Sequence, residues 1–247
     1  MGFSDRSFVI LGGTGGIGSE VARRLADGGA QLMVGARGRE GLDAIAEETG
    51  ARTYQMDATD PEAVDALFDE AIKVFDRIDG AINLVGSIFL KPAHRTSRQE
   101  WDETRAVNLD TAFFTVRSAT ERMQQNGGTI VLVSTAAAQI GLANHDAIAA
   151  AKAGVIGLTR ASAATYAKRN IRVNCVAPGL VETPLAEPLT SNEQNRQFSL
   201  GMHPLGRLGE PADIASAIQW LADDEQSWVT GQILGVDGGL AQLKTGG

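Results

Sequence analysis

Five glycines within the seven residues from Gly12 to Gly18 constrain this 247-residue chain more than any other feature. They follow an apolar run, Ser7–Leu11, and lead into an amphipathic stretch, Ser19–Asp27, which is the order strand, turn, helix. Glycine lets the backbone turn sharply and leaves no Cβ between the main chain and a ligand, so amides at the start of the helix can bind a pyrophosphate. The glycines fit G-x-G-x-x-G from Gly13 and also G-x-x-x-G-x-G from Gly12. In this context they predict a dinucleotide site.

Short β-rich apolar runs alternate with helical patterns along the whole chain. Strands that alternate with helices of ten or more residues require right-handed crossovers, and hence a parallel sheet covered on both faces. We therefore expect residues 1–247 to form a single α/β domain, with a doubly wound parallel sheet of about seven strands flanked by helices. The expected strands are Ser7–Leu11, Gln31–Gly35, Thr53–Met56, Ala81–Leu84, Thr129–Ser134, Arg172–Ala177 and Gln232–Val236.

Two stretches interrupt this alternation, Gly86–Arg98 and Pro178–Phe198, and both follow strands. Ligands of open parallel sheets bind at the carboxyl ends of the strands, so we expect these loops to form the walls of a substrate site, with His94 and His203 among the wall residues. Their apolar side chains indicate an apolar chamber. These are Ile88, Phe89, Leu90, Leu180, Leu185, Leu189 and Phe198.

Composition excludes several classes of protein. With 22 basic and 30 acidic residues the formal net charge is -8, which argues against nucleic acid as a partner. One cysteine, Cys175 in the apolar run Val173–Ala177, predicts a buried structural thiol and fits a reducing cytoplasm. Met1–Arg6 lacks a signal-peptide pattern, and the segment Thr129–Ala143 is too short and too polar to span a bilayer. Three scattered histidines provide no metal-ligand spacing, so we expect no metal and no membrane partner.

Several motifs together resemble the short-chain dehydrogenase/reductase family over nearly the whole chain. In that family a Rossmann-type sheet binds NAD or NADP, and a Ser-Tyr-Lys group with a helical Asn reduces carbonyls or oxidises alcohols. The motifs that carry the resemblance are Gly12-x-x-x-Gly16-Ile17-Gly18, Asp57, Asn83-Leu84-Val85-Gly86, Asn108, Lys152 and Pro178-Gly179.

The resemblance also implies roles for individual residues. Asp57 would bond the adenine, Asn83 would support the adenosine side of the pocket, and Thr183 would bond the nicotinamide carboxamide. Three alternatives stay open, because Asp57 could cap its own turn, Asn83 could bridge two strands, and Pro178-Gly179 is a dipeptide common in ordinary loops. The expected cofactor-binding residues are Gly12, Thr14, Gly16, Ile17, Gly18, Arg37, Asp57, Asn83, Gly86, Lys152, Pro178, Gly179 and Thr183.

The end of the second expected strand indicates which cofactor is bound. An acidic residue there would bond the ribose 2′-hydroxyl and repel a 2′-phosphate. The segment Gly35–Arg39 has no acid, and Arg37 and Arg39 offer planar, permanently charged donors to a phosphate. We therefore expect NADP(H) to be favoured over NAD(H); the alternative is that both arginines are simply solvated.

The segment from Ser134 to Lys152 departs from the family pattern. The family has its acidic tyrosine four residues before the lysine, on the same face of a helix, and here that position is Ile148, which has no proton to give. Counting the family's usual thirteen residues back from Ile148 reaches Thr135, with Ser134 beside it, where the substrate-polarising serine is expected. Lys152 and Asn108 are retained.

His145 is the residue we expect to replace the tyrosine. It lies seven residues before Lys152, and the pattern from His145 to Lys152 resembles the Tyr-x-x-Met-x-x-x-Lys of the divergent enoyl reductases of the family. An imidazole can donate a proton near neutral pH, and Asp146 could stabilise its charged form; the alternative is a surface or capping histidine. The expected catalytic residues are Asn108, Ser134, Thr135, His145 and Lys152.

Two classes of function follow from this pattern. The first is an NAD(P)(H)-dependent oxidoreductase, expected to use NADPH to reduce an activated C=O or C=C bond on a small apolar substrate. The second is a catalytically silent cofactor-binding protein that acts as a sensor or as a subunit partner. The stretches Asn108–Met123 and Ala147–Ala167 resemble the helices by which the family pairs its subunits, so we expect a homotetramer or a homodimer.

Overall fold

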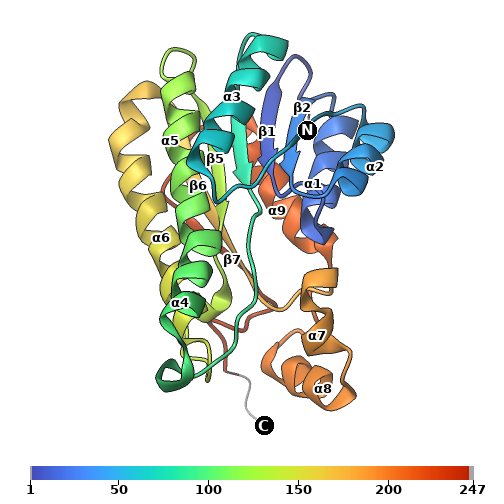
Figure 1. Cartoon of the computed structure of the whole chain (residues 1–247), viewed down its shortest axis with the longest axis vertical. Helices are drawn as coiled ribbons and strands as arrows, with labels where there is room; N and C mark the ends of the chain where they lie inside the picture. The colour runs from blue at the N-terminus through green and yellow to red at the C-terminus, as the bar shows by residue number, and fades with distance from the viewer. Residues whose placement is uncertain (1, 245–247) are drawn as a thin grey trace.

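Seven parallel strands form one sheet in the computed structural model, which describes residues 2–244 (Figure 1). Their order is β3-β2-β1-β4-β5-β6-β7, and each neighbouring pair runs parallel. This confirms the predicted doubly wound sheet, and each predicted strand end is within one residue of the observed one. The strands are β1 (Ser7–Leu11), β2 (Gln31–Ala36), β3 (Arg52–Gln55), β4 (Gly80–Asn83), β5 (Gly128–Val133), β6 (Ile171–Pro178) and β7 (Ile233–Val236).

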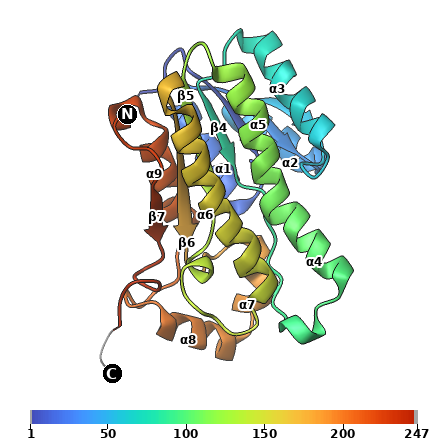
Figure 2. The ribbon, with the colours of Figure 1, turned by 90° about the vertical axis from the view of Figure 1, so that its left-hand side faces the viewer.

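Helices cover both faces of the sheet (Figures 1 and 2). One layer holds α1 (Gly16–Asp27), α2 (Arg39–Thr49) and α9 (Pro211–Ala222), and the other holds α3 (Pro61–Phe75), α5 (Thr111–Met123) and α6 (Asp146–Tyr166). Because strand side chains alternate, Phe8 and Ile10 of β1 join one apolar core while Val9 and Leu11 join the other. All of β1 is therefore buried, as a central strand of a covered parallel sheet must be.

The chain reverses its direction of travel across the sheet between β1 and β4. β1 pairs with β2 on one side and with β4 on the other, so the loops that leave their carboxyl ends diverge. Ligands of open α/β sheets bind in the crevice at such a switch point. The fold thus places a binding crevice above the glycine turn that follows β1.

Local chemistry explains where the helices begin. Before α3, the Asp60 carboxylate accepts the Glu62 amide at 2.9 Å and Pro61 occupies the first helical position, as the sequence predicts. A π-helical turn, Ala106–Asp110, lies between α4 (Arg98–Arg105) and α5. Such turns are rare in proteins, and those that occur often lie at functional sites. This one carries Asn108.

The stretch Pro178–Phe198 is not the loop that the sequence predicts. It contains α7 (Glu187–Thr190) and most of α8 (Glu193–Met202), which extend below the carboxyl ends of the strands (Figure 1). Both helices are short and mostly exposed, so they lack a clear apolar periodicity. The other stretch, Gly86–Arg98, has only a short 3-10 turn, Ala93–Arg95, before α4 begins. Within residues 2–244 no helix is both long enough and apolar enough to cross a membrane.

Candidate cofactor and catalytic site

The glycine turn is shaped by close approaches of the main chain. Gly12 has a φ of +76°, and a Cβ there would lie 3.0 Å from the Val85 nitrogen in the loop after β4. A Cβ on Gly18 would overlap the Gly12 carbonyl oxygen, and one on Gly16 would lie 2.9 Å from Cγ2 of Thr183. A Cβ on Gly15 would make only an ordinary contact of 3.6 Å. Of the two spacings, the structure therefore favours G-x-x-x-G-x-G.

A cavity of about 560 Å³ lies in the crevice above this turn. The N-terminus of α1 faces it with no acidic side chain in the first turn, so unpaired amides and a partial positive charge favour an anion. The glycine cradle and the free amides fit the pyrophosphate of a dinucleotide. The lining residues are Gly12, Thr14, Gly15, Gly16, Ile17, Gly18, Gly35, Ala36, Arg37, Gly38, Met56, Asp57, Ala58, Thr59, Leu84, Val85, Gly86, Val107, Thr183 and Leu185.

Most of the predicted cofactor residues line this cavity, but four do not. One of the four is Asn83. Its amide donates to the Thr115 hydroxyl at 2.8 Å, and its Oδ1 accepts the Val85 amide at 2.9 Å. The side chain therefore fixes the loop after β4 by joining it to α5, rather than bridging two strands. Lys152, Pro178 and Gly179 are the other three.

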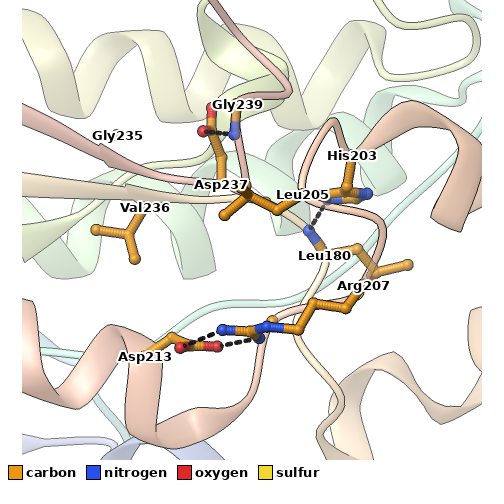
Figure 3. A pocket seen from close by; sticks show the side chains of 12 residues that line it. Leu180, His203, Leu205, Arg207, Asp213, Gly235, Val236, Asp237 and Gly239 are labelled. Carbon is orange, nitrogen blue, oxygen red and sulfur yellow. Dashed lines mark hydrogen bonds and ion pairs between the residues drawn. The ribbon is translucent and has the colours of Figure 1, made fainter. Parts of the chain in front are cut away.

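Gly179 lines a different, smaller cavity of about 320 Å³ (Figure 3). A Cβ on Gly179 would lie 2.7 Å from Nε2 of His203, so the glycine makes room for this ring. His203 is buried, and its Nε2 accepts the Leu180 amide at 3.2 Å while Nδ1 lies 2.7 Å from the Ser199 carbonyl oxygen. The neutral tautomer with its proton on Nδ1 satisfies both contacts. His203 lines this cavity, and its two bonds also join the two ends of the segment that contains α7 and α8.

Arg37 and Asp57 both line the large cavity and follow the carboxyl ends of β2 and β3, respectively. Oδ1 of Asp57 accepts the Thr59 amide at 2.9 Å and the Thr59 hydroxyl at 2.8 Å, so Asp57 does cap its own turn. These two bonds, and then the charge of Arg37, lower the pKa of Asp57. Arg39 instead pairs with Asp43 along α2, at 2.9 Å. Of the two arginines, only Arg37 lines the cavity.

Lys152 and Asn108 lie together beside Gly86, which lines the cavity. A Cβ on Gly86 would lie 3.3 Å from Oδ1 of Asn108 and 3.5 Å from Nζ of Lys152. Asn108 accepts the Ser87 amide at 3.0 Å and donates to the Ser87 hydroxyl at 2.8 Å. Nζ of Lys152 donates to the Val133 carbonyl at 2.9 Å. Burial lowers the pKa of Lys152 to about 8.

The predicted hydroxyls differ in their availability. Ser134 is 3 % exposed and donates to the Lys152 carbonyl at 2.8 Å, so it faces the backbone of α6. Among residues 2–244 the Thr135 hydroxyl makes two hydrogen bonds, both long, at 3.4 Å to the Pro178 carbonyl and at 3.3 Å from the Ala137 amide. Its hydroxyl is therefore the more easily redirected of the two. Ile148 is 6 % exposed, one turn before Lys152 on α6.

His145 is at the N-cap of α6, and its Nδ1 lies 2.8 Å from the Ala143 carbonyl oxygen. The ring is partly exposed and is not among the residues that line the large cavity. The structure thus brings Asn108 and Lys152 together and gives His145 a position at the start of the helix. Cys175 is buried as predicted, and this burial raises the pKa of its thiol to about 11.

Sequence reasoning missed Ser87, which anchors Asn108 by two hydrogen bonds. Its position directly after Gly86 is the only sequence signal that could have pointed to it. His94 lies in an exposed 3-10 turn, away from both cavities. Four apolar residues of the expected chamber, Ile88, Leu90, Leu185 and Phe198, are exposed rather than enclosed. Among residues 2–244 no cluster of His, Cys, Asp or Glu is arranged to hold a metal ion.

The sheet order, the switch-point cavity and the glycine cradle define a Rossmann-type dinucleotide-binding protein. Comparisons with known proteins agree. Residues 12–241 match the family model described as enoyl-(acyl carrier protein) reductase. The chain is 37% identical over 238 residues to the 3-oxoacyl-[acyl-carrier-protein] reductase FabG of Thermotoga maritima, covering 94% of this chain and 96% of that protein.

Two further matches extend this similarity. The chain is 36% identical over 244 residues to a (2S)-[(R)-hydroxy(phenyl)methyl]succinyl-CoA dehydrogenase subunit of Thauera aromatica, covering 97% of this chain and 98% of that one. The crystal structure of levodione reductase superposes with a TM-score of 0.92 at 31% identity, covering 98% and 100% of the two chains. This chain therefore belongs to the short-chain dehydrogenase/reductase family of NAD(P)-dependent oxidoreductases.

Burial of Lys152 should reduce the stability of the fold in a pH-dependent way. Its pKa is lowered from 10.5 to about 8, so between these values the folded chain binds fewer protons than the unfolded chain and stability rises with pH. Lys152→Met removes this cost, so at pH 7 its free energy of unfolding should be higher by about 2 kcal/mol, after part of the gain is offset by the lost bond to Val133. Urea unfolding across pH 7 to 10.5 measures the difference.

The difference between the two proteins should shrink as the pH rises and vanish below the ordinary lysine pKa, because the lost bond to Val133 then outweighs the remaining gain. Lys168→Met, at an exposed position, is the matched control and should change neither the stability nor its pH dependence. An unchanged difference between Lys152→Met and the parent protein across this pH range would contradict the lowered pKa.

Proposed function

We propose that this protein is an NADP(H)-dependent reductase of an activated C=O or C=C bond on a small apolar substrate, and that it is an atypical family member without the usual catalytic tyrosine. The observation that supports this most is the continuity of the site. The same large cavity is lined by Arg37 and by Gly86, and Lys152 and Asn108 lie beside Gly86. A cofactor that contacts Arg37 and Gly86 would therefore also come close to Lys152.

Different residues of the cavity would hold different parts of the cofactor. Thr14, Ile17 and the free amides of α1 would hold the pyrophosphate. Arg37 would hold the 2′-phosphate and Thr183 the carboxamide. The bound dinucleotide would supply the hydride. Thr135, with its two long hydrogen bonds, would turn its hydroxyl to the acceptor oxygen of the substrate.

A second function is favoured by one specific observation. Ile148 is buried where the family pattern has its proton donor, which is consistent with a silent cofactor-binding subunit. A relative from Thauera aromatica is itself described as a dehydrogenase subunit. Against this, a silent chain has no need for a buried lysine whose pKa is lowered beside the cofactor cavity. Oxidation of NADPH with a panel of ketones, enones and acyl thioesters separates the two functions.

We also propose that the protein acts in the cytoplasm.

NADPH should bind more tightly than NADH. Arg37 lines the cavity and no acidic residue precedes it in the segment Gly35–Arg37, so a 2′-phosphate meets a cation and no repulsion. Arg37→Asp should reverse the preference. Fluorescence titration with both cofactors measures it, and Arg39→Asp is the matched control because Arg39 pairs with Asp43. Equal affinities of the parent protein for the two cofactors would rule out the role of Arg37.

Conjugated acceptors should be reduced at least about tenfold faster than simple ketones, since the position of the family's tyrosine offers no proton and an enolate, being less basic than an alkoxide, needs less help from an acid. Ile148→Tyr should raise the rate with simple ketones by restoring the family arrangement. Ile148→Phe is the matched control, because it adds the ring without the hydroxyl. If Tyr and Phe give the same rate, the position does not supply a proton.

We also propose a homodimer or homotetramer formed through α5 and α6. Phe113 on α5 is 51% exposed, and Ala153 and Ala161 give α6 small exposed side chains that allow close helix approach. Light scattering at micromolar concentration should show a multiple of the monomer mass of 26.0 kDa. Ala153→Arg should lower that mass toward the monomer. A monomer mass for the parent protein would disprove the assembly.

A further inference from the structure

The proposed reduction needs a proton for the acceptor oxygen, and neither Ser134 nor His145 is placed to give one. Ser134 donates its proton to the Lys152 carbonyl. The His145 ring contacts the Ala143 carbonyl at the start of α6, outside the cavity. Thr135 can offer a hydrogen bond, but a threonine hydroxyl does not release its proton near neutral pH. The proton must therefore come from another group.

Lys152 is a buried cation with unusually few partners. It is 7 % exposed, and within residues 2–244 its Nζ makes one hydrogen bond, to the Val133 carbonyl, and no ion pair with a carboxylate. An ammonium group has three N–H donors, so two are left. Buried charges are normally paired, because an unpaired one is costly. Nζ also lies 3.5 Å from the Cβ position of Gly86, at the end of the cofactor cavity.

Resting on the proposed function, we propose that the ammonium group of Lys152 is itself the proton donor, in place of a tyrosine. When hydride adds to the acceptor carbon, the acceptor π bond breaks and its electron pair moves to oxygen. That oxygen forms a bond to a Lys152 proton. The N–H electron pair stays on nitrogen, which becomes a neutral amine and regains a proton from water after the product leaves.

Two features of the site suit this role. Burial lowers the pKa of Lys152 to about 8, close to the pH at which a general acid is most effective, while the amine stays mostly protonated at neutral pH. Asn108 and Ser87 act as positioning residues, because their two mutual hydrogen bonds fix the segment at Gly86 against which Nζ lies. The Val133 carbonyl accepts one hydrogen bond from the ammonium group and so fixes its position.

Lys152→Arg is the decisive variant, because it keeps the positive charge and the N–H donors while a guanidinium does not give up a proton. NADPH affinity, measured by fluorescence, should change less than about threefold, while turnover with an enone should fall at least about 100-fold, as for loss of a general acid. Lys168→Arg is the exposed control and should alter neither quantity. In Lys152→Ala, added methylamine or ethylamine should restore part of the turnover, which a purely structural lysine would not show.

The ionisation of Lys152 can be measured without turnover. The lysines of the chain are Lys73, Lys91, Lys152, Lys168 and Lys244, so ¹⁵N-lysine labelling yields few Nζ signals. The signal that is absent from Lys152→Met should titrate near pH 8. Turnover should correspondingly fall as the pH rises above about 8, since the donor must be protonated.

The possible outcomes separate this proposal from the proposed function. If no acceptor oxidises NADPH, both are contradicted. If turnover survives in Lys152→Arg, or if Lys152 titrates at the ordinary lysine pKa, only the proton-donor proposal is overturned. A tenfold loss in His145→Ala together with retained turnover in Lys152→Arg would assign the proton to the imidazole instead.

Discussion

The binding crevice depends on a close backbone contact between the turn at Gly12 and the loop at Val85. The turn after β1 lies against the loop after β4, and Gly12 permits this because a Cβ there would lie 3.0 Å from the Val85 nitrogen. Gly18 brings the start of α1 against the same turn. Side chains at these positions would force apart the two loops that diverge at the switch point. The cavity, the free amides of α1 and the position of Gly86 all depend on that contact.

The site places function and stability in opposition. Lys152 is buried, its Nζ donates to the Val133 carbonyl, and the thiol of Cys175, whose pKa burial raises to about 11, is a neutral neighbour. An ion in such a place destabilises a fold unless it is paired. The same burial lowers the pKa of Lys152 to about 8 and so brings the amine closer to neutrality. What makes the residue costly to the fold also makes it chemically useful.

Sequence patterns predicted those parts of the structure that depend on neighbours in the chain. The strands follow from short apolar runs, and the start of α3 follows from Asp60 and Pro61, because these effects act within a few residues. The two glycine spacings could not be separated from sequence, since the contacts that decide between them come from Val85 and Thr183, far along the chain. For the same reason the sequence does not reveal that His203 contacts Leu180. The short helices α7 and α8 lack the apolar periodicity by which longer helices are found.

The two bonds of His203 close a loop of main chain. One ring nitrogen holds Leu180 and the other holds Ser199, so a single imidazole spans the base of the segment that contains Thr183, α7 and α8. Tying both ends of a chain segment removes most of the conformational entropy that the segment would gain by opening, and that entropy grows only slowly with its length. The segment is therefore restrained at its base rather than along its exposed surface. Its tip can vary in sequence while Thr183, next to the fixed end, keeps its place against Gly16.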